Sequence, residues 1–271
     1  MRRLIVGVAV ALAGCAGIRD VRLREATAIA GAAGLAPYVL EADGFRILAF
    51  AADGPRGGTL TVYLEGDGRA WVNPWQPSTD PTPSDPTGLR LAVADPARPL
   101  LYLARPCQFV GTQGCDASLW TGARLSPRVI AAYQSLLDAA LRRTGSGRLG
   151  LVGYSGGGAL ATVIAEHRRD VAWLVTVAAD LDLAEWARLE QLAPLAGSLD
   201  PAEHVDSIAR LPQIHFAGAD DAVVPPAVAQ SFLRRMPAAN AARLVVMPGF
   251  DHDCCWVDAW PRLVGELEVR R

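Results

Sequence analysis

The chain has 271 residues, of which 51% are hydrophobic and 20% charged, and its formal net charge is −2 at pH 7. This length is enough for one large α/β domain with a sizeable core and requires no second domain. The near-neutral charge and the scattered arginines argue against a nucleic-acid partner, because phosphate binding needs a clustered basic surface.

The N-terminal segment has the anatomy of a signal peptide. Met1-Arg2-Arg3 is positively charged, and the apolar run that follows is too short to cross a bilayer as a helix. The run ends in Leu12-Ala13-Gly14-Cys15, which resembles the lipobox of bacterial lipoproteins. The resemblance implies removal of residues 1–14, a lipid on Cys15 and a membrane-anchored, periplasm-facing location in the bacterial cell envelope. Ala16, where an Asp would suggest inner-membrane retention, favours the outer membrane. An ordinary secretory signal and a buried N-terminal helix are the alternatives.

The other cysteines are expected to form disulfides, because an exported location is oxidising. Cys107 and Cys115 bracket a short loop and make an easy local pair. The adjacent Cys254 and Cys255 either bridge each other with strain or each reach that loop, so three pairings stay open. His252 lies nearby, but the two spaced Cys/His pairs of a zinc site are missing, and we expect neither a metal nor a cofactor.

Residues 15–35 are rich in Ala and Gly and are interpreted as a tether or an N-terminal helix. From residue 36 to residue 271, strand patterns alternate with helical patterns. This alternation predicts one α/β domain with a mostly parallel sheet and helices on both faces. Strands are expected at Phe45–Phe50, Thr59–Glu65, Leu100–Ala104, Leu149–Gly153, Leu174–Ala178, Gln213–Ala217 and Arg243–Met247. Helices are expected at Pro127–Arg142, Gly156–Arg169, Pro226–Arg235 and Trp256–Val269.

Two stretches interrupt the alternation. Residues 71–99 are rich in Pro, Asp, Ser and Thr and predict a long loop over the carboxyl edge of the sheet, where long loops often shape a site. Residues 180–210 contain two short helical patterns, the first around Trp186, and predict a small cap insertion.

The segment Gly153-Tyr154-Ser155-Gly156-Gly157 lies between a predicted strand and a predicted helix. A nucleophile elbow needs small residues two before and two after its serine, because the backbone is strained and the strand and helix approach closely. Gly153 and Gly157 meet this need, so we expect Ser155 to be a nucleophile. A Gly-rich helix start and a phosphate-binding turn are the alternatives. The latter would need a fuller glycine motif or a P-loop lysine, and the chain has no lysine.

A serine hydroxyl is a weak nucleophile until a base removes its proton. His252 follows the last predicted strand and therefore lies at the carboxyl edge of the sheet, where the elbow also ends. His167, His204 and His215 are interpreted as structural or surface residues, because none of them follows a strand at that edge.

An acid is expected to orient this histidine and to stabilise its charged form. The segment from Gly218 to Pro225 follows a predicted strand and resembles the Gly-x-x-Asp-x-x-Val-Pro segment of many α/β-hydrolases. The resemblance selects Asp221 over the adjacent Asp220. A role for either residue as a turn or helix-cap residue is the alternative.

Acyl transfer also needs hydrogen-bond donors for the developing oxyanion. We expect the backbone N–H of Gly156, at a helix start, to be one donor, and the backbone N–H of Asp67, in the turn Glu65-Gly66-Asp67-Gly68, to be the other. The two carboxylates of this turn would repel an oxyanion unless they turn away or pair with an arginine such as Arg69 or Arg105. An acidic turn without a catalytic role is the alternative.

These segments resemble the α/β-hydrolase superfamily over residues 40–268. Five segments are similar to a group of bacterial exported hydrolases: Tyr63-Leu64-Glu65-Gly66-Asp67-Gly68, Asp80-Pro81-Thr82-Pro83, Arg105-Pro106-Cys107-Gln108, Gly197-Ser198-Leu199-Asp200-Pro201 and Asp251-His252-Asp253-Cys254-Cys255-Trp256. The resemblance implies the α/β-hydrolase fold and the catalytic triad Ser155, Asp221 and His252, in the chain order of that fold. It implies no particular substrate.

We therefore expect a cofactor-free serine hydrolase that cleaves an ester, with a small-molecule or lipid acyl substrate, through an acyl-enzyme. The alternatives are peptidase, thioesterase, lipase, haloperoxidase-like or lyase-type use of the same residues, and a non-catalytic envelope-binding lipoprotein. Four tryptophans either line an acyl pocket or belong to ordinary packing: Trp71, Trp75, Trp120 and Trp256. The sequence makes no prediction of the oligomeric state.

Overall fold

The computed structural model describes residues 10–73, 75–112, 114–265 and 267. Most of the predicted signal peptide, residues 1–9, lies outside the described residues, and so does the side chain of Cys15. Helix α1 (Val10–Ala32) includes most of the segment interpreted as a tether or N-terminal helix, and its Ala26 and Ala30 are fully buried. Among the described helices, none has the length and apolar character needed to cross a membrane.

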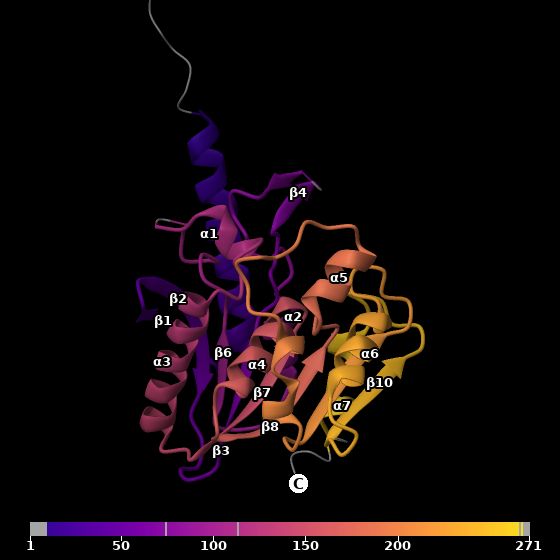
Figure 1. Ribbon diagram of the computed structural model, residues 1–271. Coiled ribbons are helices and arrows are strands. Elements are labelled where there is room, and N and C mark those ends of the chain that lie inside the picture. Colours follow the sequence, from indigo (N-terminus) through magenta and orange to yellow (C-terminus); the bar gives the residue numbers. More distant parts are fainter. Residues whose placement is uncertain (1–9, 74, 113, 266, 268–271) are drawn as a thin grey trace, which may run out of the picture.

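A sheet of eight strands forms the middle layer of the molecule (Figure 1). Its strands are β1 (Ala36–Ala42), β2 (Phe45–Ala52), β3 (Thr59–Leu64), β6 (Leu100–Leu103), β7 (Arg148–Tyr154), β8 (Val171–Val177), β9 (Gln213–Gly218) and β10 (Ala242–Met247). Their order is β1-β2-β6-β3-β7-β8-β9-β10, and all pairs from β6 to β10 are parallel, whereas β2 runs antiparallel to β1 and β6. The chain passes from β3 to β6 on one side and then to β7 on the other. Parallel sheets bind ligands at such a reversal of strand order, beyond the carboxyl ends of the strands.

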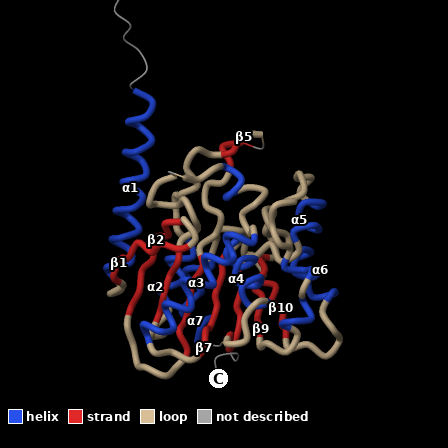
Figure 2. Tube along the Cα trace, turned by 60° about the vertical axis from the view of Figure 1, so that its left-hand side comes forward, coloured by secondary structure: helices blue, strands red, loops and turns tan. Residues whose placement is uncertain are grey.

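Helices cover both faces of the sheet (Figures 1 and 2). The remaining helices are α2 (Thr87–Ala94), α3 (Pro127–Thr144), α4 (Gly156–Glu166), α5 (Leu183–Leu189), α6 (Pro226–Arg235) and α7 (Trp256–Gly265), with short 3-10 turns η1 (Ala117–Trp120), η2 (Pro201–Glu203) and η3 (Val205–Ile208). One apolar core packs α3, α4 and α6 against the sheet, and a second packs α1, α2 and α7. Successive side chains of β7 alternate between the cores, with Leu151 in the first and Val152 in the second.

The predicted fold class is confirmed, because the sheet is mostly parallel and each predicted strand and helix overlaps an observed one. The predicted end of the last helix at Val269 lies outside the described residues. Strand β1 was not predicted from the sequence. It is an edge strand whose residues are mostly exposed, so it lacks the apolar pattern of the central strands.

The prediction of a continuous loop over residues 71–99 is wrong in part. Strands β4 (Trp71–Asn73) and β5 (Gln76–Pro77) form a hairpin there, and α2 follows. No local side chain caps α2. Instead, the carboxylate of Glu65 accepts the backbone N–H groups of Gly88 (3.0 Å) and Leu89 (3.1 Å). A cap that comes from a distant strand end leaves no local sequence signal, and the surrounding prolines hid this helix.

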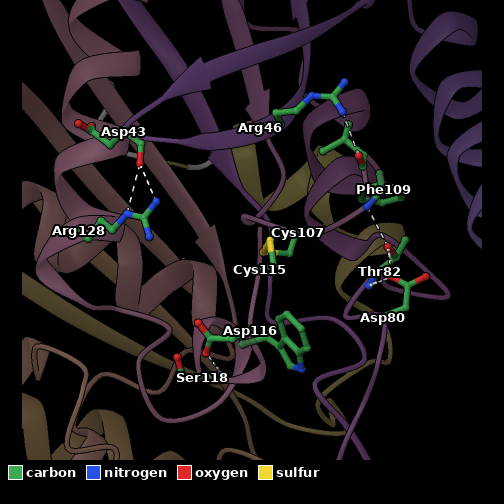
Figure 3. Close-up of a disulfide and its surroundings, with 12 residues drawn as sticks. Asp43, Arg46, Asp80, Thr82, Cys107, Phe109, Cys115, Asp116, Ser118 and Arg128 are labelled. Atoms are coloured by element: carbon green, nitrogen blue, oxygen red, sulfur yellow. Dashed lines mark hydrogen bonds between the residues drawn. A yellow bond between two sulfur atoms is a disulfide. The ribbon is translucent and has the colours of Figure 1, made fainter. Parts of the chain in front are cut away.

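Two disulfides form between residues that are close in sequence. Cys107 bonds to Cys115, and Cys254 bonds to the adjacent Cys255, which answers the pairing question that the sequence left open. Figure 3 shows the first bridge beside the loop that follows the hairpin. There, the backbone N–H of Phe109 donates a hydrogen bond to the hydroxyl of Thr82 at 2.8 Å, so the bridged loop and the loop after the hairpin support each other.

Candidate active site

Ser155 occupies the sharp turn between β7 and α4. Its backbone has φ 51° and ψ −128°, a conformation that residues with a side chain rarely adopt. A Cβ atom on Gly153 would lie 2.2 Å from the carbonyl oxygen of Gly157, and one on Gly157 would lie 2.3 Å from that of Leu64. Only glycine therefore permits this close approach of strand, turn and helix, as the sequence predicted for a nucleophile elbow.

The structure brings Ser155, His252 and Asp221 into one series of hydrogen bonds. Nε2 of His252 lies 3.1 Å from Oγ of Ser155, and Nδ1 lies 2.9 Å from Oδ2 of Asp221. The three residues follow β7, β10 and β9, respectively, so the parallel strands deliver them to one edge of the sheet.

Asp221 is held in place by the turn that follows it. Its other carboxylate oxygen accepts the backbone N–H groups of Val223 and Val224, each at 2.8 Å. The residue is 4% exposed, whereas the neighbouring Asp220 is exposed. A carboxylate that is ordered by backbone donors can keep the histidine in one tautomer and one orientation.

The loop that carries His252 is bound directly to the elbow by Tyr154. The hydroxyl of Tyr154 donates to the carbonyl oxygen of His252 at 3.0 Å, and the two rings lie 5.5 Å apart. Burial raises the pKa of Tyr154, with a further increase from the nearby Asp253, so the hydroxyl keeps its proton and remains a donor. Tyr154 lies inside the pentapeptide that indicated the elbow, but no pattern in the sequence predicts this contact.

Glu65, in the turn after β3, is committed to the fold rather than to the site. Besides the two N–H groups of α2, its carboxylate accepts the N–H of Gly66 at 2.9 Å and the hydroxyl of Tyr102 at 2.9 Å. Burial raises its pKa, and these donors act in the opposite direction. Four hydrogen bonds therefore hold this carboxylate in place.

Asp67, in the same turn, is neutralised by two buried arginines. Its carboxylate oxygens lie 2.9 Å from Nη1 of Arg105 and 2.7 Å from Nη1 of Arg124. Arg124 is also paired with the buried Asp180. Of the two arginines that the sequence offered as partners, Arg105 pairs with this carboxylate.

Sequence reasoning missed Arg124 and Asp180, which complete this ion cluster of two acids and two bases. Burial raises the pKa of Asp180 to about 6, although Arg124 opposes the shift. Asp180 follows β8 and so carries a positional signal for the same edge of the sheet. Arg124 lies in a loop far from any strand end, and nothing in its local sequence indicates its position.

The two oxyanion donors expected from the sequence are the backbone N–H groups of Gly156 and Asp67. The N–H of Gly156 is the first of α4 and has no acceptor within the helix. The turn that holds Asp67 lies against it, because a Cβ atom on Gly156 would be 2.2 Å from the Asp67 carboxylate. The N–H of Gly66 already donates to Glu65, so Asp67 is the next residue of the turn that can offer a donor.

A cavity of about 650 Å³ opens beside Ser155 and His252, and its walls include Trp71, Trp186 and Val223. The ring of Trp186 lies 4.7 Å from the guanidinium of Arg124, and its Nε1 donates to the Val223 carbonyl at 2.7 Å. A surface hollow of about 760 Å³ beside α3 and the end of α4 is larger, but it holds none of the site residues.

The four tryptophans considered for an acyl pocket lie in different environments. Trp71 lines the cavity, whereas Trp120 and Trp256 are buried in the two cores. Trp75 is 89% exposed and projects from the hairpin. Only Trp71 of this set is therefore placed to contact a substrate.

The other histidines lie away from these residues. His215 is buried, with its ring nitrogens 2.9 Å from the Thr176 hydroxyl and 3.0 Å from the Gln213 side chain, and burial lowers its pKa to about 3. The rings of His167 and His204 lie 6.4 Å apart, outside the cavity. Within the described ranges, no group of three or more His, Cys, Asp or Glu residues could hold a metal ion.

No protein-family model matches the chain, and no curated protein matches it either. The fold is similar to Est1E from Butyrivibrio proteoclasticus, with a TM-score of 0.61 and 14% identity over 85% of this chain and 96% of that one. An esterase from Pyrococcus furiosus has a TM-score of 0.60 and 14% identity over 86% and 89%. An α/β serine hydrolase homologue from Coxiella burnetii has a TM-score of 0.58 and 15% identity over 86% and 95%. The chain therefore has the fold of the α/β-hydrolase superfamily, with a serine on the elbow of that fold.

Proposed function

We propose that the chain is a serine hydrolase that cleaves an acyl ester through an acyl-enzyme intermediate. The hydrogen-bonded series from Ser155 through His252 to Asp221, on a strained elbow that opens into a cavity, carries this proposal. One of the similar structures, from Pyrococcus furiosus, is named as an esterase, which supports an ester as the substrate class.

In the proposed first half-reaction, Oγ of Ser155 attacks the ester carbonyl carbon while Nε2 of His252 takes the hydroxyl proton. Asp221 accepts a hydrogen bond from the Nδ1–H and stabilises the imidazolium. The tetrahedral intermediate then collapses, and the alkoxide leaves with the proton from His252. In the second half-reaction, His252 removes a proton from water, which attacks the acyl carbon and forms a second tetrahedral intermediate. This intermediate collapses, Oγ of Ser155 leaves with the proton from His252, and the carboxylic acid is released.

The oxyanion of each tetrahedral intermediate would accept hydrogen bonds from the backbone N–H groups of Gly156 and Asp67. The dipole of α4 favours negative charge at this helix start. Arg105 and Arg124 cancel the charge of the Asp67 carboxylate, which otherwise would repel the oxyanion. The ion cluster thus makes an acidic turn compatible with acyl transfer.

A fluorophosphonate probe tests the nucleophile, because it labels only a serine that a base has activated. We expect labelling of the wild-type chain and none of Ser155→Ala. Asp221→Asn should lower kcat about 10⁴-fold by favouring the wrong histidine tautomer, whereas the matched Asp220→Asn should leave it unchanged. Absence of labelling in the folded wild-type chain would instead support a non-catalytic binding protein.

A panel of p-nitrophenyl esters of increasing acyl length tests the substrate class. Turnover that depends on Ser155 supports the esterase assignment, and its dependence on chain length measures how deeply the acyl group enters the cavity. Thioester and amide analogues of the best substrate, measured in parallel, separate esterase from thioesterase and peptidase activity.

We also propose that a lipid on Cys15 anchors the protein in the bacterial envelope, facing the periplasm, with the outer membrane favoured. The lipobox resemblance supports this proposal, and the two disulfides fit an oxidising compartment. Metabolic labelling with an alkyne fatty acid tests it. The wild-type chain should incorporate the label, and Cys15→Ala should not.

A further inference from the structure

The β4–β5 hairpin exposes three large apolar side chains. Trp71 is 47% exposed, Val72 is 50% exposed and Trp75 is 89% exposed. Residues 71–77 carry no charged side chain. Tryptophan is a highly buried residue on average, so two exposed tryptophans and a valine within five positions mark an interaction surface.

Strand pairing and hydrogen bonds hold the hairpin in place on the domain. Trp71 pairs with Pro77 across the hairpin, and the N–H of Ser78 donates to the carbonyl of Ala70 at 2.9 Å. Below it, Nε1 of the buried Trp120 donates to the carbonyl of Ser78 at 3.1 Å. The hairpin therefore presents its apolar side chains in a defined direction.

The hairpin also forms part of the mouth of the catalytic cavity. Trp71 lines that cavity together with Ser155, and the half-exposed Val223 lies on its wall. Figures 1 and 2 show the hairpin above the carboxyl edge of the sheet, at the end of the molecule where the site loops gather. A surface that binds the hairpin would therefore face the cavity opening.

The N-terminal part of helix α1 extends from the domain at the same end of the molecule as the hairpin. Arg19 forms an ion pair with Asp80 at 3.3 Å, and Nη1 of Arg22 donates to the carbonyl of Thr82 at 2.9 Å, so α1 is fastened to the loop that follows β5. In both views, α1 runs upward beside the hairpin. Cys15 precedes Arg19 by about one helical turn, or about 6 Å along the axis.

We propose that this hairpin docks onto a lipid bilayer, with Trp75 and Val72 in the headgroup and upper acyl region. Tryptophan favours this boundary, because its ring is apolar and its N–H needs a polar partner. The uncharged hairpin adds no desolvation penalty from ionised groups. The N-terminal anchor site at the same end makes a bilayer the fitting occupant, since an anchor alone holds the domain near the membrane and a second rigid contact orients it.

The inference deepens the proposed function and rests on it, because it names the substrate class. A cavity whose mouth faces lipid would take the acyl esters of membrane amphiphiles, which enter from the bilayer past Trp71. Soluble short esters would still reach Ser155 from water, without help from the hairpin.

Vesicle flotation tests the docking without the lipid anchor. The processed chain from residue 16 onward, which lacks the predicted signal peptide and Cys15, is mixed with vesicles of phosphatidylethanolamine and phosphatidylglycerol. We expect it to float, and we expect Val72→Ala/Trp75→Ala in the same background to bind about tenfold more weakly, as the loss of buried apolar area predicts. Tyr38→Ala, which removes a part-exposed aromatic ring on β1, should bind like its parent.

Turnover separates this inference from the proposed function. The hairpin variant should hydrolyse a soluble short-chain ester at the parental rate, which also shows that it folds. It should hydrolyse a long-chain ester presented in the same vesicles about tenfold more slowly. A parent that fails to float, a hairpin variant that floats equally well, or a concentration-dependent dimer that the variant abolishes would overturn the docking proposal. Absence of any ester turnover would refute the esterase assignment, and the flotation result would still test membrane docking by the hairpin.

Discussion

Two glycine-containing turns meet at the candidate active site and are held in different ways. The turn after β7 is set by backbone sterics, because Gly153 and Gly157 allow strand, turn and helix to touch. The turn after β3 is set by side chains from elsewhere, because its Glu65 caps α2 and its Asp67 pairs with two arginines. The first turn could be recognised from five consecutive residues. The sequence also indicated the second turn and offered Arg105 as a partner, but Arg124 and the cap on α2 could not be predicted, because only folding brings them near.

The two turns also have different roles in the proposed chemistry. The elbow positions the nucleophile, and its geometry tolerates almost no added atoms. The β3 turn would supply the proposed oxyanion donor, and its electrostatics tolerate almost no unpaired charge. Substitutions should therefore damage the two turns for different physical reasons, steric in one and electrostatic in the other.

The largest effect on stability is expected at the ion cluster. Arg124→Met keeps the volume but leaves the buried Asp67 and Asp180 without the cation between them. Breaking a buried charge network in this way should lower the free energy of unfolding by about 3–5 kcal/mol, measured by urea denaturation. Arg148→Met, at an exposed position on β7, is the control and should change it by less than about 0.5 kcal/mol. Equal effects of the two variants would mean that the cluster does not hold the β3 turn.

The elbow is tested by Gly157→Ala. The new methyl group would lie 2.3 Å from the Leu64 carbonyl oxygen and 2.4 Å from that of Glu65, and neither backbone atom can rotate away. We expect a loss of about 3 kcal/mol in unfolding free energy, together with slower fluorophosphonate labelling of Ser155. Gly147→Ala has open space around its new methyl group and should cost nothing. Normal labelling of Gly157→Ala would contradict the steric account of the elbow.

A smaller effect is expected when Glu65 loses its charge but keeps its shape. In Glu65→Gln, the amide nitrogen would face N–H or O–H donors that now bond to a carboxylate oxygen. The resulting unsatisfied donors should cost about 2 kcal/mol, with the loss concentrated in α2, where hydrogen exchange would report it. Glu41→Gln, exposed on β1, serves as the matched control. Unchanged protection of α2 would show that its cap comes from another source.

A pH dependence of stability is expected at a buried carboxyl that lacks donors. Neither oxygen of Glu166, at the end of α4, has a hydrogen-bond partner among the described residues, and burial, with Asp200 and Glu203 nearby, raises its pKa to about 9. The folded state therefore holds this proton more tightly than the unfolded state, so the contribution of this group to stability is greatest below pH 4.5 and falls as the pH rises toward 9. Glu166→Gln should increase the free energy of unfolding at pH 8, by an amount that shrinks as the pH falls, and leave it unchanged at pH 4. An identical pH dependence of unfolding in the variant and the wild type would contradict this assignment.

The sequence by itself predicted the features that depend on local backbone chemistry and on regular spacing. The alternation of strand and helix patterns indicated the parallel sheet, since each central strand buries both faces. The glycines around Ser155 indicated the elbow. The positions of Asp221 and His252 directly after strands predicted that they would lie at the same edge, and the structure places them within hydrogen-bonding distance there.

Only the tertiary structure decided the contacts between side chains that are far apart in the chain. Arg124 reaches Asp67 and Asp180, and Glu65 caps α2, through distances that no periodic pattern encodes. The exposure of Trp75 was equally hidden, because a tryptophan in the sequence looks the same whether it is buried or not. Backbone sterics act between neighbours and so can be read from sequence, whereas burial and charge pairing depend on which distant segments the fold brings together.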